Sequence, residues 1–195
     1  MQYVKDIADY HSKSDRIEGW RPLLEFGLKI PTPVKTVTHE GFEFYKKNKV
    51  TGQLKEEVLT AFEDIRQKNS ERGVYVGRGY FVPGLQAPPG PRSSSVKSPE
   101  VVLSEVEKLF EFAINNNFDK SGSEINIIMH PFINPIVPMS GGCITPSRHS
   151  KSDLIVEAIY GNDEGVQSFY HDTFYVNVDK MIITKKVIQT KTQCL

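Results

Sequence analysis

The sequence contains little cysteine or tryptophan and carries no net charge. Its 195 residues include one tryptophan and two cysteines, Cys143 and Cys194. Two cysteines without metal-type spacing argue against a disulfide framework and against a cysteine-rich metal site. Lysine plus arginine equals aspartate plus glutamate, at 24 each, so nucleic acid and anionic membranes are not the expected partners. Any anion-binding site must therefore be local.

The N-terminus also lacks an uninterrupted apolar segment. Charged residues interrupt the stretch MQYVKDIADY, so we expect neither a signal peptide nor a membrane anchor, and we expect a cytoplasmic location. The composition, 38% apolar and 25% charged, is typical of a soluble globular protein. A chain of this length can form one large core or two small lobes that share a cleft.

The first half of the chain has the pattern of helices. An amphipathic helix around Trp20 should end in the segment GLKIPTP, where glycine and prolines interrupt it. A short strand is expected at 34–37, after which Thr38 can cap a helix over 39–48. A further helix is marked by apolar residues at helical spacing: Leu54, Val58, Ala61, Phe62 and Ile65.

The second half has the pattern of strands. A strand is expected at 73–82, whose GRG is too short for a dinucleotide fingerprint and is interpreted as a turn. A Pro/Gly/Ser-rich loop follows, and Ser98 with Pro99 begins a helix that reaches about residue 115. Later strands are expected at 125–132, 136–144, 153–159, 173–178 and 181–188. We therefore predict an α+β fold, with a helix-rich lobe over 1–98 and a strand-rich lobe over 99–195 around a cleft.

Two charged residues stand out before any resemblance is considered. Glu157 interrupts the apolar run LIV–AI, and a buried carboxylate needs a metal ion, a cation or a cleft. The alternative is an edge strand in which Glu157 faces water or pairs with a lysine. Arg92 precedes three serines in the loop and has the side-chain geometry for a phosphate. The alternative for that loop is a flexible linker.

The C-terminal segment DLIVEAIYGNDEGVQSFYHDTFYVNVDK resembles LVIEASYGLGEAVVQGxVxPDxFYVxK, a pattern of the ATP-binding domains of phosphoenolpyruvate synthase, pyruvate phosphate dikinase and rifampin phosphotransferase. The resemblance places Glu157 at the family's metal-binding glutamate and Glu164 on the turn after it, as a second metal or ribose ligand. Gln167 lies one position from the family's glutamine, and the alternative residue for that place is Ser168. A turn glutamate such as Glu164 is also often simply solvated.

Upstream segments resemble the same family. INIIMHPFINPIVPMSGGCITP is similar to VAVVVQKMVxxxxSGVxFTxxP, which implies that the strand with Met129 and His130 faces adenine. PRSSS resembles VRSSA and puts Arg92 at the phosphate-binding arginine, while the first helix puts Arg16 where a phosphate-binding lysine stands. The alternatives are a hydrogen-bonded core histidine for His130 and a solvated arginine for Arg16.

The resemblance implies an ATP-grasp-like domain that binds Mg-ATP, with Glu157 as the metal ligand. In the family, phosphoryl groups go to a histidine on a swivelling domain, so a partner protein would supply it here. The family's acidic continuation after the arginine motif and its SFAG segment have no counterpart in this sequence. Two other hypotheses stay open: a catalytically inactive nucleotide-binding or protein-interaction module, and a fragment of a longer enzyme.

Overall fold

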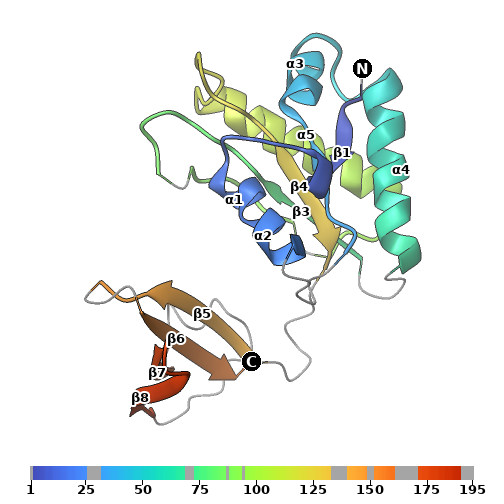
Figure 1. The fold of residues 1–195 in the computed structure, drawn as a ribbon. Coiled ribbons are helices and arrows are strands. Elements are labelled where there is room, and N and C mark those ends of the chain that lie inside the picture. Colours follow the sequence, from blue (N-terminus) through green and yellow to red (C-terminus); the bar gives the residue numbers. More distant parts are fainter. Residues whose placement is uncertain are drawn as a thin grey trace. The chain divides into compact units, whose positions relative to one another are not determined.

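The computed structural model describes residues 2–25, 32–68, 73–86, 88–93, 95–132, 140–148, 152–160 and 171–189. The chain forms two compact units, Met1–Ile133 and Asn134–Leu195. Each unit contains an antiparallel four-stranded sheet (Figure 1). The helices of the described residues lie in the first unit, and the predicted α+β class is confirmed. No helix in the described part of the chain combines the length and apolar character needed to cross a membrane.

The sheet of the N-terminal unit has the strand order β1-β2-β4-β3, with every neighbouring pair antiparallel. Strand β4 is central and pairs with both β2 and β3. The predicted strands at 34–37, 73–82 and 125–132 are all present, whereas the first strand was not predicted. The bounds are Val4–Asp6 for β1, Lys35–Val37 for β2, Val74–Arg78 for β3 and Ile127–Pro131 for β4.

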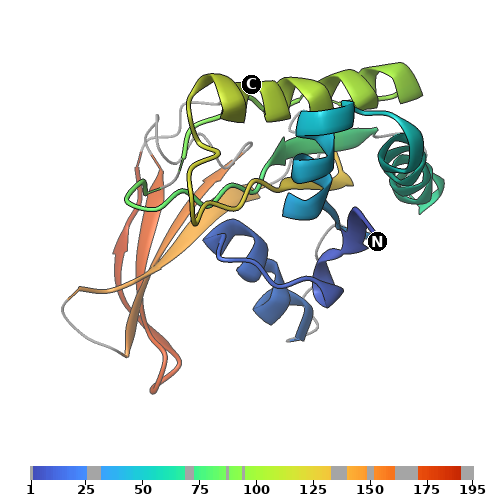
Figure 2. The ribbon, with the colours of Figure 1, turned by 90° about the horizontal axis from the view of Figure 1, so that it is seen from above.

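Helices cover both faces of this sheet (Figures 1 and 2). Helices α3 (His39–Asn48), α4 (Gly52–Lys68) and α5 (Pro99–Asn115) pack on one face. The short helices α1 (Asp15–Glu18) and α2 (Trp20–Glu25) pack on the other. Strand β4 shows the alternation that this arrangement requires: Met129 lies in the larger core and Ile128 in the smaller one.

The main helices begin where the sequence predicts. The Thr38 hydroxyl accepts a hydrogen bond from the Gly41 N–H at 3.4 Å, and Ser98 accepts one from Val101 at 3.4 Å. Each cap satisfies a backbone donor that the first turn leaves unpaired. On α4, the five apolar residues that predicted the helix are at most 5% exposed. Local capping and amphipathic spacing therefore account for these helices.

The boundary between the units lies 35 residues later than the predicted lobe boundary between 98 and 99. Helix α5 packs on the first unit, because Phe110 contacts Phe42 and Tyr45 of α3 at ring-centroid distances of 5.3 and 5.0 Å. Strand β4 then enters the centre of the first sheet. The Pro/Gly/Ser-rich loop therefore connects two elements of one unit and does not separate two lobes.

The C-terminal unit is a meander of four antiparallel strands in sequence order. Its register places Cys143 and Thr173 on either side of Glu157, so these three side chains share one face. The residues of β6 from Asp153 to Ala158 are half-buried, whereas the sequence indicated a largely buried strand. The bounds are Ser140–Pro146 for β5, Asp153–Tyr160 for β6, Asp172–Asn177 for β7 and Ile182–Val187 for β8.

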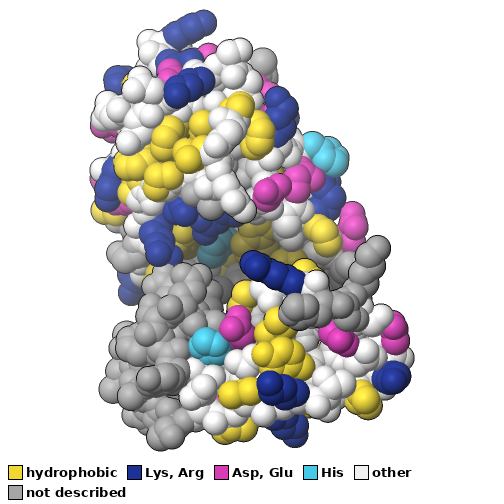
Figure 3. Space-filling view, turned by 90° about the vertical axis from the view of Figure 1, so that its left-hand side faces the viewer, with side chains coloured by type: hydrophobic (Ala, Val, Ile, Leu, Met, Phe, Trp, Pro, Cys, Tyr) yellow, Lys and Arg dark blue, Asp and Glu magenta, His cyan; other side chains and the backbone are white. Residues whose placement is uncertain are grey.

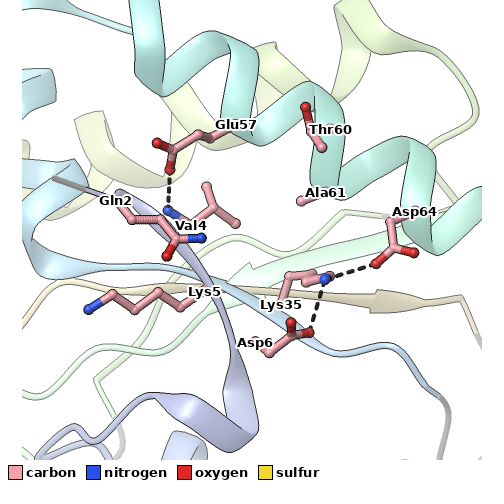
Figure 4. A pocket seen from close by; sticks show the side chains of 9 residues that line it. All are labelled: Gln2, Val4, Lys5, Asp6, Lys35, Glu57, Thr60, Ala61 and Asp64. Carbon is pink, nitrogen blue, oxygen red and sulfur yellow. Dashed lines mark hydrogen bonds and ion pairs between the residues drawn. The ribbon is translucent and has the colours of Figure 1, made fainter.

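An ion-pair triad joins β1, β2 and α4 in the N-terminal unit. The Lys35 ammonium group lies 2.9 Å from Asp6 and 2.8 Å from Asp64, and these three residues help to line a pocket of about 230 Å³ (Figure 4). At the same pocket, Glu57 accepts a hydrogen bond from the Val4 N–H at 2.8 Å. The side chain of Lys35 is only 16% exposed, so the two carboxylates stabilise a charge that is largely removed from water.

Replacing Lys35 with methionine is expected to destabilise the N-terminal unit by about 1–2 kcal/mol at pH 7, between the values for exposed and buried pairs. The hydrogen bond from Lys35 lowers the pKa of Asp64, so this stabilisation is present above the carboxyl's unfolded-state pKa. It is lost as the pH falls through the lower, folded-state pKa. Urea unfolding at a series of pH values should therefore show the two proteins converging in acid.

The control for this prediction is Lys68→Met, which removes the other cation near Asp64 at 3.0 Å. The side chain of Lys68 is 60% exposed, so we expect a smaller loss of stability than for Lys35→Met. Equal losses for the two variants at pH 7 would show that the Lys35 triad contributes no more than a solvated surface pair.

Candidate functional site: an arginine cluster in the N-terminal unit

Three arginines come together near the end of β3. Arg78 is the last residue of that strand, and Arg16 belongs to α1. The backbone of Arg92 forms an isolated antiparallel bridge with Gly77, the neighbour of Arg78. The sequence predicted Arg16 and Arg92 as phosphate contacts, and both lie close enough to Arg78 to affect its pKa. The structure therefore adds Arg78 to the two predicted residues.

Arg16 and Arg78 make hydrogen bonds to neutral acceptors. An Arg16 Nη2 group donates to the Tyr75 hydroxyl at 3.2 Å, and an Arg78 Nη1 group donates to the Gly90 carbonyl at 3.2 Å. Within the part of the chain that the structure describes, neither side chain forms an ion pair with a carboxylate. Each guanidinium has five N–H donors, so both retain donors for an anion.

The charges in this cluster repel one another. Burial lowers the pKa of Arg78, and the positive charges of Arg16 and Arg92 lower it further. The group stays protonated at neutral pH, because a free arginine titrates far above that range. An anion bound here would relieve the repulsion. On the molecular face in Figure 3, basic and acidic side chains are interspersed, as expected for a chain without net charge.

The loop that carries Arg92 is attached to the edge of β3. The Ser93 N–H donates to the Val76 carbonyl at 2.9 Å, and the Ser93 hydroxyl accepts from the Val76 N–H at 2.8 Å. Two hydrogen bonds between Val74 and Val96 continue this pairing. These contacts do not fit the alternative of a flexible linker and fix the backbone of Arg92 beside Arg78.

Gly90 allows the loop to approach Arg78 closely. A Cβ atom at position 90 would lie 2.9 Å from the Arg78 Cδ and 3.3 Å from the Tyr80 ring. The distance to Arg78 is shorter than real Cβ atoms show, so a larger residue would displace the arginine side chain. The glycine carbonyl is also the acceptor for Arg78. Gly90 therefore holds this guanidinium in its position.

Aromatic rings lie next to Arg16. The His130 ring stacks on Tyr75 at 4.6 Å between centroids and contacts Trp20 at 5.5 Å. Burial lowers the pKa of His130; the nearby carbonyl of Pro131 opposes this shift, and the charge of Arg16 adds to it. His130 is therefore neutral at pH 7, with its Nδ1 2.8 Å from the Pro131 carbonyl oxygen. The stack fits the alternative of a hydrogen-bonded histidine and leaves a nucleotide contact as a prediction.

Met129 has a different position from His130. Its side chain is fully buried in the core under α3, α4 and α5. Its backbone lies between Lys35 of β2 and Val76 of β3 in the sheet register. The Met129 side chain therefore belongs to the core, and the adenine contact expected from the backbone of this strand stays a prediction.

Glu157 lies in the C-terminal unit and pairs with a histidine. Its carboxylate Oε1 is 3.0 Å from the His171 Nε2, and the two side chains are 29% and 23% exposed. Neither alternative from the sequence, a water-facing glutamate or a lysine pair, describes this contact. His171 was not predicted as a site residue, although it directly precedes Asp172 in the family-like HDTFYV segment.

The described residues around Glu157 provide few metal ligands. They contain no group of three or more His, Cys, Asp or Glu side chains arranged to hold a metal ion. Magnesium is often bound by one or two carboxylates, with substrate phosphates and water supplying the other oxygens. Glu157 fits a magnesium ion only in that form, as a ligand to a metal–phosphate complex. Glu164 and Gln167, the other predicted contacts, lie outside the described residues.

Comparisons with known proteins give limited information. No family model matches the chain, and no curated protein matches it. Among solved structures, it is similar to the dinucleotide forming acetyl-coenzyme A synthetase 1 of Ca. Korarchaeum cryptofilum, in complex with coenzyme A, Ca-AMPCP and HgCl+. The identity is 14%, the TM-score is 0.44, and the match covers 86% of this chain and 72% of the other.

Proposed function

We propose that the chain binds ATP and that the arginine cluster formed by Arg16, Arg78 and Arg92 contacts its phosphates. The observation that carries the proposal is the convergence of these side chains, two of which hydrogen-bond only to neutral acceptors among the described residues. Guanidinium groups match the geometry of phosphate oxygens and bind them through two N–H donors at once. The three positive charges repel one another, and no carboxylate among the described residues pairs with Arg16 or Arg78. Such a cluster does not stabilise the fold and is better suited to binding an anion.

A second proposal concerns the C-terminal unit by itself, in which Glu157 would be the protein ligand of the magnesium ion in a metal–phosphate complex. When bound, the ion would neutralise charge on the phosphate oxygens. His171, 3.0 Å from the carboxylate, would orient Glu157 and fix which oxygen faces the ion. By resemblance to the phosphoenolpyruvate synthase family, the reaction would be phosphoryl transfer to a histidine on a partner protein. Arg16 in place of the family's lysine keeps the charge at that position.

Replacing Glu157 with glutamine tests the metal ligand. We expect the affinity for Mg-ATP to fall about ten-fold, the size expected when one charged oxygen ligand is lost. Isothermal titration calorimetry should show this loss with magnesium present and no difference between the proteins for ATP in EDTA. Asp179→Asn, which changes an exposed carboxylate of the same unit, is the control and should bind as the wild type does. An equal loss in EDTA would contradict a metal role.

The alternative function is a nucleotide-binding module without catalytic activity, or a module that binds another protein. The arginine at position 16 favours this alternative, because Arg and Lys differ in reach and donor geometry where a phosphoryl group moves. Binding of Mg-ATP without ATP consumption, measured as phosphate or AMP release, would support it. The absence of Mg-ATP binding in calorimetry would contradict both nucleotide functions.

A further inference from the structure

A pocket of about 460 Å³ lies beside the arginine cluster in the N-terminal unit. Its polar wall includes Ser14, Arg16 and Arg78, and its apolar wall includes Phe81, Leu85 and Pro88. This volume is in the range of small-molecule sites, which combine apolar walls with a few polar groups. The same two guanidinium groups therefore belong both to the cluster and to the lining of the pocket next to it.

The polar wall of this pocket offers donors to an anion. Arg16 and Arg78 provide two positive charges, and Asp15 provides the one carboxylate among the described lining residues, so the lining keeps a positive charge. Ser14 is 2% exposed, and its hydroxyl has no hydrogen-bond partner within the described residues. A buried hydroxyl normally has a partner, and rotation about its Cα–Cβ bond can direct this one to a ligand oxygen.

The apolar wall is unusual for a site that would bind only inorganic phosphate. Leu85 is 40% exposed and is held in a turn by a hydrogen bond from its N–H to the Val82 carbonyl at 3.0 Å. Phe81 and Pro88 add further apolar surface to the same wall. An exposed leucine gains stability only when another apolar group covers it, and phosphate oxygens cannot do this.

We propose that this pocket binds the organic part of an organic phosphate. The phosphate group would contact Arg16 and Arg78, and an aromatic or branched apolar group would cover Phe81, Leu85 and Pro88. This inference rests on the proposed function, because the same arginines supply the charge. It adds that the ligand carries an apolar group next to its phosphate.

Phenyl phosphate and inorganic phosphate distinguish the two parts of the pocket. Calorimetric titration of the wild-type chain should give at least about ten-fold tighter binding of phenyl phosphate, because the ring buries apolar surface. In Leu85→Ser, this ratio should fall to about one while the affinity for inorganic phosphate is unchanged. Val101→Ser replaces an apolar residue of similar exposure, 47%, on α5 and should keep the wild-type ratio.

The outcomes distinguish failure of the pocket assignment from failure of the proposed function. Equal affinities for the two phosphates in the wild type, or a ratio that Leu85→Ser leaves unchanged, would overturn the pocket assignment. If Mg-ATP still binds in either case, the proposed function survives that result. Binding of neither simple phosphate, with Mg-ATP binding intact, would also overturn the pocket assignment. A loss of Mg-ATP binding as well would remove the proposed function on which it rests.

Discussion

Replacing Arg78 with glutamine is expected to weaken the binding of Mg-ATP by about 10- to 100-fold. The substitution removes one charged donor group, and hydrogen bonds to charged groups contribute about 1.5–3 kcal/mol each. The positive charges of Arg16 and Arg92 both lower the pKa of Arg78, so this guanidinium lies near two other cations. Isothermal titration calorimetry at constant magnesium and salt measures the loss directly.

The same substitution should not destabilise the folded unit strongly. Glutamine keeps a side-chain N–H donor for the Gly90 carbonyl, and the repulsion from the neighbouring arginines disappears. Arg66→Gln is the matched control, because Arg66 on α4 is not among the charges that affect the pKa of Arg78 and pairs with Glu63 at 3.7 Å. Lysine at position 78 should have an intermediate affinity, since it keeps the charge and loses the planar fork. Wild-type affinity in Arg78→Gln would remove Arg78 from the site.

Replacing Phe110 with alanine is expected to reduce the free energy of unfolding of the N-terminal unit by about 3–5 kcal/mol, the range for a large aromatic residue in a core. The side chain is fully buried and contacts both Phe42 and Tyr45 of α3. Its loss leaves a cavity between α3 and α5, which the fixed backbones of two helices cannot close. Urea unfolding followed by the fluorescence of Trp20 reports this unit, because the sequence contains one tryptophan.

Phe112→Ala on the same helix provides the comparison. Phe112 is only partly buried and contacts Phe118 edge-on at 6.0 Å between ring centroids. We expect the free energy of unfolding to fall by about 1 kcal/mol, because a partly exposed ring removes less apolar surface from water on folding. If Phe110→Ala and Phe112→Ala lower the free energy of unfolding equally, the contacts of Phe110 are not what stabilises the packing of α5. The position of the unit boundary after α5 would then need another explanation.

Much of the fold could be predicted because its signals are local. The helix over 39–48 has a capping threonine, and the helix that begins at Pro99 has a capping serine, so both starts are visible in a few residues. The burial of Leu54 and Ile65 follows from spacing along one helix face. Strand β1 consists of Val4, Lys5 and Asp6, and one apolar residue followed by two charged ones gives no pattern typical of a strand.

The site was harder to predict because it depends on contacts between distant segments. Arg92 stood out from its serine-rich loop and Arg16 was proposed through a resemblance, whereas Arg78 was hidden in the GRG segment interpreted as a turn. That interpretation was wrong, because Gly77 and Arg78 pair with Ile128 and Ile127 in the sheet. The signal that would have indicated Arg78 is a cationic residue at the end of an apolar strand. It was missed because the two glycines beside Arg78 suggested a turn.

The predicted lobe boundary was also misplaced because it depends on contacts between separate segments. Proline, glycine and serine mark the loop from 83 to 98, but composition does not reveal whether a loop separates two bodies or folds back on one. The bridges from Arg92 and Val96 to β3 decide this, and they join residues that lie far apart in the sequence. His171 illustrates the point again, since its contact with Glu157 spans two strands.

The two outer strands of the N-terminal sheet are both protected. The segment with Ser93 and Val96 occupies the free edge of β3, and the Glu57 carboxylate binds the N–H groups of Tyr3 and Val4 at the start of β1. Unpaired backbone groups on an edge strand are a template on which another chain can add a strand. With these groups occupied, we expect the sheet to offer fewer positions at which a strand of another chain can pair.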